Sequence, residues 1–69
     1  MTDVDRTYLF AFDNPANARI FVERLTLNLK HVVIFISGEH VKVIDGSELG
    51  QREAILRLAR TSGAMHAAF

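Results

Sequence analysis

Three histidines are the side chains of this chain whose charge can change near neutral pH, and they stand at His31, His40 and His66. No two of them are two or four positions apart, the spacings that put a pair of ligands on one side of a strand or helix. This spacing favours ordinary surface histidines and predicts no metal site. The sequence leaves open whether His40 and His66 meet on one face of the folded chain.

Two aspartates, Asp13 and Asp45, each stand between an apolar run and a helical pattern. Carboxylates just after strands can serve as general acids or bases in α/β proteins. The favoured interpretation is structural, because turns favour aspartate and a negative charge stabilises the positive end of a following helix. Ser47 lacks the Gly-x-Ser-x-Gly context of a nucleophile, and its turn lacks the glycine spacing of a phosphate-binding loop. We therefore predict no catalytic residue and no cofactor.

The charges of the chain balance, with eight basic and eight acidic residues. A balanced charge supplies no long-range attraction for nucleic acid, so a nucleic-acid partner is not expected. No apolar run approaches the roughly 20 residues of a membrane-spanning helix, and the first residues lack the pattern of a signal peptide. The chain has no cysteine, which excludes disulfides and thiolate sites. We expect a cytoplasmic protein with no membrane association.

The clearest structural pattern lies between residues 31 and 45, where two β-branched runs flank the sequence Ser-Gly-Glu. This pattern predicts a β-hairpin whose tight turn has Gly38 at a positive φ. The predicted register pairs Ser37 with His40, Ile36 with Val41, Phe35 with Lys42 and Ile34 with Val43. One face is then wholly apolar and consists of Val32, Ile34, Ile36, Val41 and Val43. The other face is mixed and consists of Val33, Phe35, Ile44, His40 and Lys42.

The remaining elements follow from alternation, helical periodicity and capping. Residues 6–12 predict a strand, with Tyr8, Phe10 and Phe12 on one face and Leu9 and Ala11 on the other. Asn14 and Pro15 predict the cap and first turn of a helix that ends at about residue 28 or 29. Its expected apolar stripe is Ala18, Phe21, Val22, Leu25 and Leu29.

After the hairpin, Ser47 is expected to cap a second helix over residues 48–61. Its expected buried residues are Leu49, Ile55, Leu56 and Ala59. Gly63 is the natural residue to end this helix, because glycine readily adopts the left-handed conformation found there. Residues 64–69 form either a short last strand or a frayed end.

The order of elements is β-α-β-β-α, followed by a final β if residues 64–69 form a strand. This order predicts a single α+β domain over residues 1–69, with residues 1–5 frayed. Two interleaved β-α-β units give a ferredoxin-like two-layer sandwich, an antiparallel sheet with two helices on one face. The first and third strands are expected to be central and parallel. A domain of this size buries only about 60% of the surface of its unfolded chain, so self-association is expected.

Residues 13–20, Asp-Asn-Pro-Ala-Asn-Ala-Arg-Ile, resemble the start of an ACT domain, a small regulatory module with a ferredoxin-like fold. In that family the first strand ends in a turn of the type Asp-x-Pro-Gly-x-x-x-Ile. The resemblance in order and length covers nearly the whole chain. It implies a regulatory domain that dimerises and binds an amino acid or similar molecule at Asp13, Asn14 and Ala16. Ala16 stands where the family has glycine.

The missing catalytic motifs and the extra apolar surface favour a non-enzymatic regulatory or interaction domain, acting as a homodimer or binding a protein partner or small molecule. The expected interface consists of Val33, Phe35, Ile44, Lys42 and His40. One alternative is a small dimeric enzyme whose site lies between protomers, with Tyr8, His40 and Asp45 as candidates. Another is a weak RNA-binding module that uses Lys42 and the strand aromatics. It is disfavoured because the third strand carries no aromatic residue.

Overall fold

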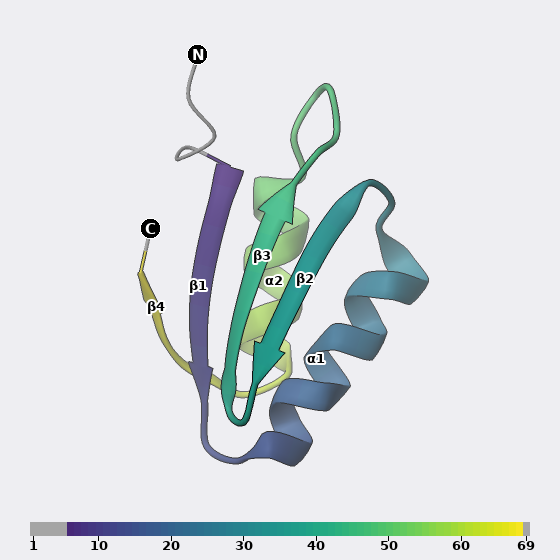
Figure 1. The fold of residues 1–69 in the computed structure, drawn as a ribbon. Coiled ribbons are helices and arrows are strands. Elements are labelled where there is room, and N and C mark those ends of the chain that lie inside the picture. Colours follow the sequence, from purple (N-terminus) through teal and green to yellow (C-terminus); the bar gives the residue numbers. More distant parts are fainter. Residues whose placement is uncertain (1–5, 69) are drawn as a thin grey trace.

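The computed structural model describes residues 6–68 and has an α+β fold with four strands and two helices. The elements in chain order are β1 (Thr7–Phe12), α1 (Pro15–Asn28), β2 (Val32–Ser37), β3 (His40–Asp45), α2 (Arg52–Thr61) and β4 (Ala64–Ala68). The sheet has the order β2-β3-β1-β4, and both helices lie on one face of it (Figure 1). This arrangement confirms the predicted ferredoxin-like sandwich. The expected fraying of residues 1–5 lies outside the described residues.

The two central strands are β1 and β3, as predicted, but they run antiparallel and not parallel. The reason is topological. The crossover through α1 brings β2 back in the direction of β1, and the hairpin then reverses the chain into β3. A strand inserted between β1 and β2 in this way must run opposite to both of them.

The β2–β3 hairpin has the predicted register. Its pairs include Ser37 with His40, Ile36 with Val41, Phe35 with Lys42 and Ile34 with Val43. Gly38 has a φ of 60° at the turn, in the region that favours glycine. The tight turn therefore sets which hairpin residues face the helices.

The core lies between the sheet and the helices. Its buried apolar residues are Tyr8, Phe10, Phe12, Ala18, Phe21, Leu25, Val41, Val43, Ile55 and Ala59. Phe21 of α1 is at its centre, with its ring centroid 5.2 Å from those of both Phe10 and Phe12. Helix α1 starts as predicted, because the Asn14 side chain accepts a hydrogen bond from the backbone N–H of Asn17 at 2.8 Å. The aromatic strand β1 and the apolar stripe of α1 thus form one core.

Helix α2 begins at Arg52, so the prediction of a helix from residue 48 with Ser47 as its cap is wrong. Leu49 was expected to be buried but is 99% exposed, in a loop over residues 46–51. The physical reason lies in Asp45, whose side chain binds the backbone N–H groups of both Ser47 and Gln51. These two bonds fold the intervening residues into a loop and leave Gln51 as the N-cap residue.

The chain closes with β4, which pairs antiparallel to β1 and resolves the question of the final residues up to Ala68. Gly63 follows the end of α2 with a φ of 94°, as the sequence predicted. The pairing contains an irregularity beside Ala11 and Phe12. Neither helix within residues 6–68 combines the length and apolar character that crossing a membrane requires.

Candidate functional site

The sheet face away from the helices is the candidate functional surface, and it is called the open face below. Strand alternation places Leu9 of β1 and Val33 and Phe35 of β2 on this face. These three side chains are 46%, 50% and 55% exposed. Ile44, the fourth large apolar residue, is half-buried. Apolar side chains therefore collect on the one sheet surface that no helix covers.

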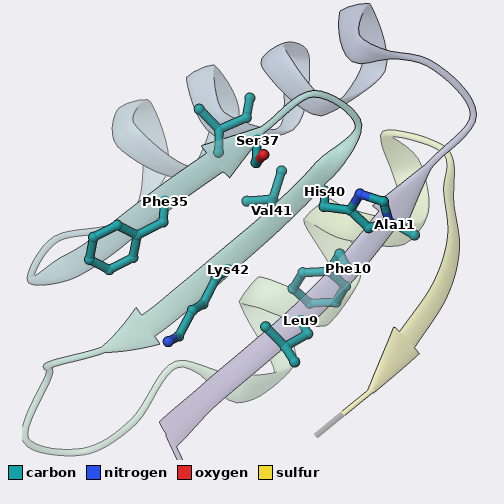
Figure 2. Close-up of a pocket in the computed structure, with 9 residues that line it drawn as sticks. Leu9, Phe10, Ala11, Phe35, Ser37, His40, Val41 and Lys42 are labelled. Atoms are coloured by element: carbon teal, nitrogen blue, oxygen red, sulfur yellow. The ribbon is translucent and has the colours of Figure 1, made fainter.

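A hollow with a volume of about 350 Å³ lies in the open face, across β1, β2 and β3. Figure 2 shows its lining residues, which come from these three strands. Six of them alternate onto the open face: Leu9, Ala11, Phe35, Ser37, His40 and Lys42. None of the residues that line the hollow is acidic.

Lys42 stands in the middle of this surface, because it pairs with Phe35 on one neighbouring strand and with Leu9 on the other. Its Nζ atom lies 5.8 Å from the centroid of the Phe35 ring. A cation at this distance from an aromatic face is attracted to it. The ammonium group therefore lies near the Phe35 ring, which lines the hollow.

Two of the three histidines share a row of the sheet, and the third lies apart from them. His40 is exposed and pairs with Ala11, and His66 pairs with the same Ala11 from the other side. The register thus brings these two histidines into one row of the sheet, on strands separated by β1. His31 is also exposed and lies before β2, away from this row. Within residues 6–68, no group of three or more potential ligands could hold a metal ion.

A second polar cluster surrounds Asp45, the last residue of β3, whose side chain is only 2% exposed. One carboxylate oxygen accepts bonds from the backbone N–H and the hydroxyl of Ser47, at 3.0 and 2.7 Å. The other oxygen accepts a bond from the backbone N–H of Gln51 at 2.6 Å. The Gln51 side chain adds a longer bond of 3.3 Å to the first oxygen. Both oxygens of the carboxylate thus accept hydrogen bonds from the loop that follows β3.

The pKa of the Asp45 carboxyl lies below its ordinary value. Burial works in the opposite direction and raises the pKa, because desolvation disfavours the charged form. The hydrogen bonds from Ser47 and Gln51 outweigh burial, because they stabilise the carboxylate, and the net effect lowers the pKa. Asp45 is therefore charged at neutral pH and serves as the fixed acceptor of the loop.

The same loop is joined to the rest of the molecule by hydrogen bonds with three positions outside it. The N–H of Gly46 donates to the carbonyl of His31 at 2.7 Å, and the Gln51 side chain donates to the carbonyl of Lys30 at 2.9 Å. The Arg6 guanidinium donates to the carbonyl of Ser47. Together with the hydrogen bonds of Asp45, these contacts fix the loop to the segments that precede β1 and β2.

The three residues considered for an enzyme site do not meet within one protomer. Tyr8 and Asp45 are 3% and 2% exposed, and their strand positions face the helices. His40 is exposed on the open face. The aromatics considered for RNA stacking are not accessible on the open face either, since Phe10 and Phe12 are buried against the helices. A base approaching the open face meets the ring of Phe35 instead.

The turn that resembles an ACT domain is exposed at Asp13, Asn14 and Ala16. The side-chain oxygen of Asn14 already accepts the capping bond of α1. Asp13 and Ala16 remain accessible on either side of this cap. The structure therefore presents these three residues at one exposed turn, separate from the residues that line the hollow.

The sequence indicated the open face but did not indicate the hollow or the part that Gln51 plays. The alternation of residues 6–12 was the signal for Leu9, because it placed this residue opposite the buried aromatics. Gln51 gave no signal, since its bond to Asp45 depends on how the intervening loop folds.

No family model, curated protein or solved structure matches the chain.

Proposed function

We propose that the chain is a non-enzymatic regulatory and interaction domain that forms a homodimer through the open face. The observation that carries the proposal is the exposure of Leu9, Val33 and Phe35 together on that face. Apolar residues gathered on one surface are typical of protein interaction sites. Their burial against a second molecule would extend the core of a domain so short that it buries only about 60% of the surface of its unfolded chain.

A second copy is the partner that fits this surface best. Most homodimers have two-fold symmetry, so the same patch serves both copies and must match itself. The large side chains of the open face meet this condition, because Leu9, Val33 and Phe35 are apolar and apolar surfaces can pack against each other. Phe35 is also an aromatic residue, a class that buries a large apolar area and is enriched at interfaces.

The regulatory part of the proposal rests on the resemblance to ACT domains. The non-enzymatic part is supported by Asp45, whose buried carboxylate accepts hydrogen bonds from its own loop. The absence of cysteine is compatible with action in the reducing environment of the cytoplasm. A domain of this type would act by associating with itself, and a bound ligand or protein would shift that association.

The test is the solution mass by size exclusion with light scattering at two protein concentrations, for the wild type, Phe35→Glu and Leu27→Glu. Leu27 is the matched control because it is 84% exposed on α1, outside the open face. We expect a dimer for the wild type and the control, and a monomer for Phe35→Glu. A wild-type monomer at both concentrations, or an unchanged dimer mass for Phe35→Glu, would contradict the proposal.

A further inference from the structure

We infer that the hollow in the open face binds a small carboxylate with an apolar tail, that Lys42 holds the carboxylate, and that binding strengthens the dimer. This inference rests on the proposed homodimer and names its ligand class. It follows from three observations: the charge at Lys42, the apolar walls around it and the size of the hollow.

Within residues 6–68, the charged strand residues of the open face are basic. Strands β1, β2 and β4 contain no acidic residue. The one acidic residue of β3, Asp45, is 2% exposed and already accepts bonds from Ser47 and Gln51. The Lys42 ammonium group is therefore a cation without a carboxylate among the strand residues around it.

Dimerisation through this face makes the charge of Lys42 unfavourable in free energy. Two-fold symmetry brings the Lys42 side chains of both copies to the same interface, where they repel each other. Removing a cation from water without a partner is also unfavourable. An anion that enters with the second copy relieves both effects, because it supplies the missing opposite charge to Lys42.

The shape of the hollow determines what kind of anion fits. Its volume of about 350 Å³ is at the lower end of the range of about 300–1,000 Å³ found for ligand pockets. Leu9 and Phe35 stand on either side of Lys42 in the sheet, so apolar side chains flank Lys42 on both neighbouring strands. A bare inorganic anion leaves this surface uncovered, whereas a carboxylate with a short hydrocarbon tail covers it.

Three probes separate the contributions of charge and tail: octanoate, octanol and acetate. Octanoate has both features, octanol has only the tail, and acetate has only the carboxylate. We expect octanoate to lower the dimer dissociation constant of the wild type about ten-fold, which is a typical coupling between two binding events. Octanol and acetate should each change it less than about two-fold. Sedimentation equilibrium with each probe gives these constants.

Lys42→Met is the test variant, because methionine keeps a long apolar stem and removes the charge. Lys30→Met is its matched control, since Lys30 is an exposed lysine between α1 and β2 and does not line the hollow. We expect Lys42→Met to dimerise at least as tightly as the wild type without any probe, and to lose the response to octanoate. Lys30→Met should retain it. Circular dichroism verifies that both variants are folded.

The outcomes distinguish this inference from the proposed function. A wild-type dimer that responds equally to octanoate and octanol, or not at all, overturns the ligand class and leaves the homodimer standing. An undiminished response in Lys42→Met overturns the assignment of the carboxylate to Lys42. A chain that remains monomeric with and without octanoate overturns both the homodimer and its ligand.

Discussion

The two faces of the sheet carry similar side chains and differ in what covers them. On the helix side, Phe10 and Phe12 are 3% and 2% exposed against α1. On the open face, Leu9, Val33 and Phe35 are 46–55% exposed. Strand alternation thus gives this sheet two apolar surfaces, but the two helices cover only one of them (Figure 1). The helix side holds the domain together, and the open face is available to another molecule.

The faces also differ in how their polar groups are satisfied. Asp45 lies at the helix side and accepts bonds from Ser47 and Gln51, which fix the loop between them. Lys42 lies on the open face, against the ring of Phe35. A group bound within the fold supports the fold, whereas a charge next to exposed apolar surface can recognise another molecule. Substitutions on the two faces should therefore affect different measurements.

The largest effect on stability is expected from Phe21→Ala. Phe21 is fully buried and its ring contacts those of Phe10 and Phe12. Removing a buried phenylalanine costs about 3–5 kcal/mol, because both apolar contacts and packing are lost. Urea denaturation, at a dilution where the chain is monomeric, measures the free energy of unfolding. A loss below about 1 kcal/mol would contradict the placement of Phe21 at the centre of the core.

Asp45→Asn is expected to lower the free energy of unfolding by a smaller amount, about 2–3 kcal/mol at neutral pH. The amide group has one acceptor oxygen, so donors on Ser47 or Gln51 are left unpaired in a buried place. The difference should also depend on pH. Because the folded pKa of Asp45 is lowered, its carboxylate stabilises the fold above the unfolded pKa of about 3.9, and this contribution disappears as pH falls through the folded value.

Urea denaturation of both proteins at pH 7 and pH 3 measures this pH dependence. The other carboxyl groups are present in both proteins, so the difference between wild type and Asp45→Asn isolates Asp45. We expect this difference to shrink at the lower pH. A difference that is the same at both pH values would show that the charge of Asp45 does not support the loop.

The smallest effect on stability is expected from Phe35→Ser at the same dilution. Phe35 is 55% exposed and packs on the open face, outside the core. Exposed substitutions of this kind usually change the free energy of unfolding by less than about 0.5 kcal/mol. A loss as large as that of Phe21→Ala would mean that the open face belongs to the core of the monomer. The two faces would then not differ as described.

The features that the sequence predicted correctly depend on local pattern. The hairpin register followed from alternation and from Gly38, and the start of α1 followed from Asn14 and Pro15. Local pattern did not establish the direction of β3 relative to β1, which depends on the path of the whole chain. It also missed the late start of α2, because Asp45 binds Gln51 across six positions.

The candidate surface was predicted in part. Val33 and Phe35 were identified because apolar residues on a second sheet face have no use within a simple two-layer fold. The hollow could not be predicted, since it depends on how the side chains of three strands lie together. The position of Lys42 over Phe35 is likewise a matter of side-chain conformation, which residue spacing does not encode.

The central claim is that the open face joins two copies of the chain. It is tested most directly by isotope-filtered NMR on a sample that mixes labelled and unlabelled protein, where contacts between copies are observed alone. We predict contacts from the Phe35 ring of one copy to the methyl groups of Leu9 and Val33 of the other. Contacts between copies that involve Leu27 of α1 or Leu49 of the loop, without Phe35, would contradict the claim.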